Sequence, residues 1–175
     1  MSRWKCICAY DGTRFAGWQT QPTHDAVQDR IEAALFKILK TQVRIQGSGR
    51  TDAGVHALAQ VFHFDADWGH SYANLLSALR TNLPASVQIR SVEEVPADFH
   101  ARYSASGKRY HYRLFLGQAD PFETRYCLSI PWELDIAAIK QAGQMLIGEH
   151  NFSAFAAENG VEPDQDNPVK DFRHF

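Results

Sequence analysis

WKCICAYDG (residues 4–12), followed by DAVQDRIEAALFKI (residues 25–38), decides the fold of the first part of this chain. The first stretch alternates with period two, is rich in strand formers and ends in a DG turn, so it predicts a β-strand. In the second stretch apolar residues recur at helical spacing and predict an amphipathic helix. We expect Asp25 to cap this helix, with Gln28 three residues later completing a capping box.

The next elements continue this alternation of strands and helices. Short stretches rich in strand formers predict strands at residues 43–45, 60–64 and 87–92. Ser71 is expected to cap a second helix that stops before Pro84 and turns four apolar residues inward: Tyr72, Leu75, Leu76 and Leu79. Together these elements form a β-α-β-β-α-β lobe, which we assign to residues 1–104.

Residues 105–175 predict a second, partial α/β lobe. Strict alternation makes residues 108–116 the clearest strand of the chain. Asp135 is expected to open a third helix with four residues inward: Ile136, Ile139, Gly143 and Leu146. Residues 160–168 are expected to form a surface loop and residues 169–175 to begin a strand. The fold class is therefore α+β.

Composition and charge limit the classes of protein to which this chain can belong. The 175 residues carry a net charge of −2, without an apolar run that could span a membrane and without a leader-like N-terminus. We therefore expect a cytoplasmic protein with no membrane partner. Its three cysteines lack metal-binding spacing and are interpreted as free thiols of a reducing compartment: Cys6, Cys8 and Cys127. The histidine spacings match no common zinc pattern, so no metal is expected.

Cations gather in one stretch of this mildly acidic chain. Residues 99–114 contain no Asp or Glu and include Arg102, Lys108, Arg109 and Arg113. Such a local basic surface can guide a phosphate backbone, and it can also be an ordinary solvated strand face. Composition alone leaves both interpretations open.

The run GSGRTDAGVHA (Gly47–Ala57) is the strongest candidate for a site. Its glycines allow tight turns and close approach of a ligand to the backbone. If Arg50 pairs with Asp52, it favours an ionised carboxylate, the form that a nucleophile needs. Two other interpretations remain: a turn held by an ion pair, and a phosphate-binding loop, although the usual phosphate-loop patterns are absent.

Four stretches occur in a distinctive order: YDGTRFAGWQ (residues 10–19), GSGRTDAGVHA, FHARYSASGKRYHYRL (residues 99–114) and GEHNFSAF (residues 148–155). In this order they closely resemble the bacterial tRNA pseudouridine synthase A family. The resemblance implies conversion of uridine to pseudouridine in the anticodon stem-loop of tRNA, without cofactor or metal, by a homodimer. It implies a mixed, mostly antiparallel sheet with helices on one side, built as two ferredoxin-like halves, the second incomplete here.

The resemblance also implies roles for individual residues. Asp52 matches the catalytic aspartate of the family, and Arg50 matches the arginine that pairs with it and helps to hold the flipped nucleotide. Tyr110 matches the tyrosine that stacks on the target uracil. Contacts with RNA phosphates are expected from Arg102, Lys108, Arg109 and Arg113. Phe15 and Trp18 are expected either to line the RNA cleft or to pack in the core.

Members of the family are normally longer than this chain, so the sequence is expected to lack a C-terminal part. The alternative function is therefore a truncated, non-catalytic RNA-binding remnant. Turnover and binding measured on the same RNA distinguish the two hypotheses.

Overall fold

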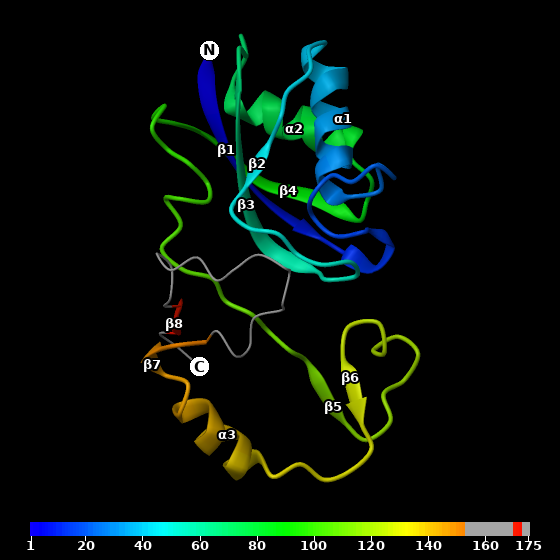
Figure 1. Cartoon of the computed structure of the whole chain (residues 1–175). Helices are drawn as coiled ribbons and strands as arrows, with labels where there is room; N and C mark the ends of the chain where they lie inside the picture. Colours follow the sequence, from blue (N-terminus) through cyan, green and yellow to red (C-terminus); the bar gives the residue numbers. More distant parts are fainter. Residues whose placement is uncertain (153–169, 173–175) are drawn as a thin grey trace. The chain divides into compact units, whose positions relative to one another are not determined.

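The computed structural model describes residues 1–152 and 170–172. The chain divides into two compact units, Met1–His111 and Tyr112–Phe175 (Figure 1). No helix in the described ranges is both long enough and apolar enough to cross a membrane. The surface loop expected at residues 160–168 lies outside the described residues.

The first unit has the predicted order β-α-β-β-α-β, with a short 3-10 helix η1 (Gly12–Arg14) after the first strand. Its elements are β1 (Ser2–Tyr10), α1 (Val27–Leu39), β2 (Gln46–Gly47), β3 (Ala57–Ala66), α2 (Tyr72–Asn82) and β4 (Val87–Val95). The strands form one antiparallel sheet in the order β2-β3-β1-β4. This element order defines a ferredoxin-like unit.

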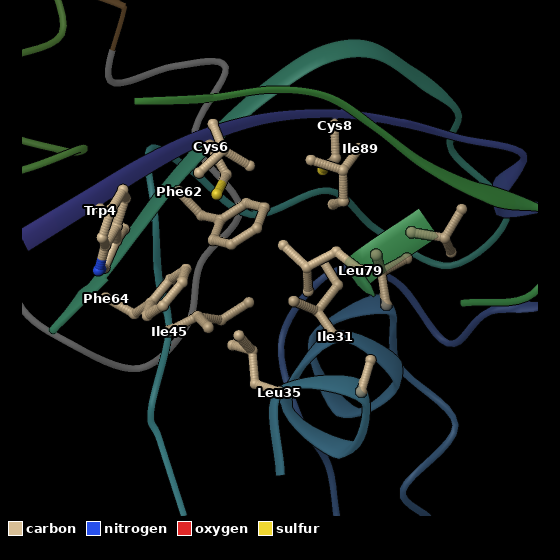
Figure 2. Close-up of a cluster of buried hydrophobic side chains, with 14 of the residues drawn as sticks. Trp4, Cys6, Cys8, Ile31, Leu35, Ile45, Phe62, Phe64, Leu79 and Ile89 are labelled. Atoms are coloured by element: carbon tan, nitrogen blue, oxygen red, sulfur yellow. The ribbon is translucent and has the colours of Figure 1, made fainter. Parts of the chain in front are cut away.

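The core lies between this sheet and its two helices, α1 and α2 (Figure 2). Alternate residues of β1 are buried, including Cys6 and Cys8, which meet Ile31 of α1 and Leu79 of α2 in the same cluster. Burying one such aliphatic side chain stabilises a fold by about 1.5–3 kcal/mol. Burial raises the pKa of the Cys8 thiol to about 12 and also raises that of Cys6, so both are neutral core groups.

The opposite face of the sheet carries the segment that follows β4. Arg3 in β1 forms a two-pronged ion pair with Asp65 at 2.7 Å and donates hydrogen bonds to the carbonyls of Ala97 and Phe99. The Arg3 guanidinium lowers the pKa of the Asp65 carboxyl. His63 in β3 is buried and its Nδ1 accepts from the Ala101 amide at 3.2 Å. These bonds place residues 97–101 against the sheet.

The second unit has little buried apolar surface in its described part. β5 (Leu114–Leu116) pairs in parallel with β6 (Leu128–Ile130), and β7 (Gly148–His150) pairs antiparallel with β8 (Lys170–Phe172). The helix α3 (Ile136–Gln144) lies between them in the chain and buries none of its residues. β8 confirms residues 170–172 of the strand expected at residues 169–175, and the other four residues lie outside the described ones.

Two of the three predicted helix caps are confirmed and one is wrong. The Ser71 and Asp135 side chains accept from backbone amides in the first turns of α2 and α3. The first helix is capped differently, because Ala26 is its N-cap and the Asp29 carboxylate accepts from the Ala26 amide at 2.9 Å. Asp25 instead accepts from the Thr23 hydroxyl.

The predicted strand at residues 108–116 is shorter than alternation indicates. Only Leu114–Leu116 forms a strand, and residues 105–113 have no regular structure. A strand requires a neighbour that receives its backbone hydrogen bonds, and alternation of side chains does not supply one. In the described part no strand pairs with residues 108–112, and of residues 108–113 Arg113 receives a bond at its carbonyl from the Leu128 amide, at 2.8 Å.

Three further expectations need correction. The short strand expected at residues 43–45 forms instead at Gln46–Gly47, opposite Phe62 and His63 of β3. Tyr72, expected inward, is 64% exposed, because Leu75 and Leu79 define the buried face of α2. Two of the residues expected inward on α3, Ile136 and Ile139, are also exposed.

Candidate functional site

The loop that joins β2 to β3 is held by backbone bonds to residues 10–18. The Trp18 amide donates to the Thr51 carbonyl at 3.0 Å, and the Gly54 amide donates to the Phe15 carbonyl at 3.2 Å. The Tyr10 and Thr51 hydroxyls lie 2.9 Å apart. The YDGTRFAGWQ and GSGRTDAGVHA stretches are therefore neighbours in space, and the first fixes the backbone of the second.

Two glycines allow this close approach. A Cβ atom added to Gly12 would lie 2.0 Å from the Val55 carbonyl oxygen, a distance that no side chain can adopt. Gly17 has φ near +96°, and a Cβ there would lie 2.5 Å from the Thr51 carbonyl oxygen. Both positions require glycine because backbone occupies the space where a side chain would begin.

Asp52 and Arg50 project from this anchored loop and both are exposed. Neither forms an ion pair with any residue of the described part, so the pairing considered from the sequence is absent from this structure. Burial raises the pKa of the adjacent Tyr10 to about 12, which keeps its phenol protonated at neutral pH. The loop thus combines a fixed backbone with an accessible carboxylate.

His56 is a site residue that sequence reasoning missed, because it was considered only as a metal ligand. Its Nδ1 accepts from the Gly12 amide at 3.1 Å and lies 3.2 Å from the Asp11 carboxylate. It joins the end of the GSGRTDAGVHA loop to the turn after β1. The sequence did contain a signal for this contact. Gly12 lies in YDGTRFAGWQ and His56 lies in GSGRTDAGVHA, two of the stretches on which the family resemblance rests. Within the described ranges no three His, Cys, Asp or Glu side chains gather as metal ligands.

An open pocket of about 790 Å³ lies in the first unit beside this loop. Four cationic side chains line it and none of its lining residues is acidic: Arg44, Arg50, Arg102 and Lys108. Arg44 pairs with Glu32 at 3.1 Å, whereas the other three form no ion pair with described residues. The pocket is also lined by the aromatic residues Trp18, His100 and Tyr103.

The structure brings some of the predicted site residues together and leaves others apart. Arg50, Arg102 and Lys108 share the pocket, while Arg109 is exposed outside its lining. Tyr110 is 67% exposed and has no hydrogen bond or ring contact with Asp52 in the described part of the chain. Arg113 belongs to the second unit and is also exposed.

Phe15 packs in the core, whereas Trp18 packs in the core and also lines a pocket. They are 8% and 1% exposed and belong to the buried cluster, although Trp18 also borders the pocket. The Trp18 indole packs where a Cβ on Gly47 would fall, 2.4 Å from its Nε1. The start of the loop, at Gly47, therefore packs on the Trp18 ring on the side of the core.

Comparison with known proteins gives consistent results. Residues 7–104 match the model of a family described as tRNA pseudouridine synthase. The chain is 46% identical to the tRNA pseudouridine synthase A of Lacticaseibacillus casei over 94% of its own length and 68% of that relative. It is 46% identical to the enzyme of the same name from Listeria innocua over 90% of its own length and 64% of that relative. For the Geobacillus kaustophilus protein of this name the identity is 44%, over 91% of this chain and 63% of the relative. The chain thus spans about two thirds of the length of these relatives.

Proposed function

The chain belongs to the tRNA pseudouridine synthase family, and on that premise we propose that it isomerises uridine to pseudouridine in the anticodon stem-loop of tRNA. The observation that carries the proposal is Asp52, an exposed carboxylate on a loop whose backbone is anchored at Thr51 and Gly54. A nucleophile held on a fixed backbone can meet a substrate with little loss of orientation.

The reaction rearranges the nucleotide without adding or removing atoms. The bond between N1 of uracil and C1′ of ribose breaks, the base turns, and C5 becomes bonded to C1′. C5 loses its proton to solvent and N1 gains one, so the composition of the nucleotide is unchanged. Asp52 supplies the nucleophile: its carboxylate bonds to C6 of the base or to C1′ of the sugar, and that bond breaks again before the product leaves, which regenerates the free carboxylate. Because nothing is oxidised, reduced or transferred from a donor, side chains suffice and no cofactor is required.

The remaining site residues act on the RNA. An enzyme that modifies a base inside a stem-loop must first extrude it from the stack, which calls for stacking partners and cations. Tyr110 stacks on the target uracil, and Arg50, two residues from Asp52, helps to hold the extruded nucleotide. Arg102, Lys108, Arg109 and Arg113 contact the phosphate backbone, which carries most of the affinity in such complexes.

The same proposal covers the division into lobes, the oligomeric state and the cellular location of the protein. Residues 1–104 form the first lobe, with the catalytic loop, and residues 105–175 contribute to a second ferredoxin-like half. The protein acts as a homodimer in the cytoplasm. Its free cysteines support that location because thiols persist in a reducing compartment.

The test is tritium release from tRNA labelled at C5 of uridine. We expect the chain to release tritium and Asp52→Asn to reduce the rate at least about a thousandfold, since the amide cannot act as the nucleophile. RNA affinity should stay within a few-fold of the unmodified chain. Asp98→Asn is the matched control, because Asp98 is an exposed carboxylate on the segment after β4 and should leave the rate unchanged.

Either of two outcomes would contradict this proposal. Turnover by Asp52→Asn near the parent rate would remove Asp52 from the chemistry. RNA binding without tritium release from the unmodified chain would favour the non-catalytic binding module instead.

A further inference from the structure

We propose that the pocket lined by Arg50, Arg102, Lys108 and Tyr103 binds a second, unpaired nucleotide of the same RNA, distinct from the uridine that is isomerised. This inference rests on the proposed function, since it takes RNA as the ligand. It adds a binding site for a neighbouring nucleotide and assigns Tyr103 as the surface on which that base stacks.

The charge of the pocket selects an anionic ligand. The protein as a whole carries a net charge of −2, yet the pocket lining holds four cations and no Asp or Glu. Glu32 forms an ion pair with Arg44, and the other three cations form no ion pair with described residues. Arg50, Arg102 and Lys108 come from two separate stretches of sequence, and Lys108 reaches across to Gly49, where its Nζ would lie 2.6 Å from an added Cβ. Three cations converging from separate segments form a phosphate site.

The aromatic wall selects a base beside that phosphate. Tyr103 is 78% exposed, so its ring is accessible to a base. Its ring is supported from within the protein by His100, with ring centroids 4.3 Å apart and planes tilted by 32°. His100 is itself held by a 3.1 Å contact between its Nε2 and the Gln46 side chain. A supported and exposed ring next to cations is the arrangement on which proteins stack unpaired bases.

The place of Asp52 separates this pocket from the position of the target uridine. Arg50 and Gly49 line the pocket, whereas Asp52, two residues further along the same loop, does not. Because the target nucleotide must bring its reacting carbon against Asp52, the occupant of the pocket is a neighbouring nucleotide of the strand. Arg50 borders both positions, so it contacts the target nucleotide and the phosphate that joins it to this neighbour. The pocket volume of about 790 Å³ lies in the range of sites that hold a small molecule of nucleotide size.

The test measures RNA affinity in the Asp52→Asn background, so that binding is separated from turnover. Arg102→Ala should raise the Kd at least fivefold and reduce the slope of log K against log salt by about 0.7, the value for one lost phosphate contact on a single strand. Arg90→Ala is the matched control, because Arg90 is an exposed cation of β4 outside the pocket. Tyr103→Leu should raise the Kd at least fivefold, while Tyr103→Phe, which keeps the ring, should stay within twofold.

Crosslinking locates the base that Tyr103 contacts. The chain is bound to tRNA in which single uridines of the anticodon loop, other than the target, are replaced by 4-thiouridine. After irradiation, the peptide crosslinked to the RNA is identified by mass spectrometry. We expect a crosslink to the peptide that contains Tyr103 from a nucleotide adjacent to the target. Tyr103 is exposed, so circular dichroism should show that its variants fold normally.

The outcomes separate this inference from the proposed function. Weaker binding by Arg102→Ala and Tyr103→Leu, with the crosslink, supports the pocket even if the chain releases no tritium. Tritium release combined with unchanged affinity in both variants overturns the pocket and leaves the isomerase standing. Absence of any crosslink to the peptide that contains Tyr103, or no binding of the RNA, also overturns the pocket.

Discussion

At the scale of single residues, the GSGRTDAGVHA loop depends on contacts of backbone with backbone. Gly12 touches the Val55 carbonyl so closely that no Cβ fits between them, and the Gly12 amide donates to His56. Asp52 lies within the segment that these contacts hold in place. A glycine forty residues before Asp52 in the sequence therefore helps to determine where the carboxylate lies, because it leaves room for the backbone of the loop.

Gly12→Ala should disturb both stability and activity. The added methyl group meets backbone that cannot rotate away, so we expect a loss of about 1–3 kcal/mol in the free energy of unfolding. Displacement of the loop should lower tritium release at least tenfold, because small misplacements of a nucleophile are costly. Chemical denaturation and the release assay measure the two effects.

Gly69→Ala is the control for this substitution. Nothing lies within 4 Å of a Cβ at Gly69, so the change should shift stability by less than about 0.5 kcal/mol and leave turnover unaltered. Equal effects of the two substitutions would show that the contact with Val55 does not hold the loop.

At the scale of elements, the start of α1 shows how one side chain of the first turn can join a helix to the preceding loop. The Asp29 carboxylate accepts from the Ala26 amide at the N-cap and also from the Thr20 hydroxyl of the preceding loop. The ring of His24 approaches the same carboxylate at 3.5 Å. One acidic side chain in the first turn therefore joins the loop to the helix and interacts favourably with the helix dipole.

The two aspartates near this terminus should differ in their contribution to stability. Asp29→Ala removes the bonds to Ala26 and Thr20 and should lower the free energy of unfolding by about 1–2 kcal/mol. Asp25→Ala removes one bond to the exposed Thr23 side chain and should cost about 0.5 kcal/mol or less. Thermal and urea unfolding of both variants measure the difference, and the reverse order would restore Asp25 as the cap.

At the scale of the whole molecule, buried apolar surface is concentrated in the first unit. The main hydrophobic cluster extends from Trp4 to Val92, entirely within Met1–His111. In the described part of the second unit the buried hydrophobic residues are Ala119 and Ile130. Because burial drives folding, the two units should differ in local stability.

Hydrogen exchange on the full chain should reveal that difference. Amides of β1 and β3, which pair with each other in the middle of the first sheet, should exchange only on global unfolding. Amides of α3, which buries no residue, should exchange at least about a hundredfold faster. Mass spectrometry of peptic peptides provides the measurement. Equal protection in α3 and β1 would mean that the second unit is stabilised by more than the contacts of its described residues.

Sequence periodicity was sufficient for the first unit because each pattern there has a partner in space. The alternate residues of β1 and the helically spaced apolar residues of α1 pack against each other in one core. The predicted β-α-β-β-α-β order and most of its elements are therefore confirmed. Residues 108–113 alternate just as strictly but form no strand, since pairing depends on a neighbour that periodicity cannot reveal.

For the candidate site, the sequence by itself determined the identity of the GSGRTDAGVHA loop, its carboxylate and its cations, because these are properties of residue type and order. Tertiary structure decided the rest: that Gly12 and His56 hold this loop, that Trp18 supports it from the core, and that Arg102 and Lys108 meet Arg50 at one pocket. The physical reason is distance along the chain. Contacts between residues about 30 to 60 positions apart arise from how strands and helices pack, and no local pattern encodes them.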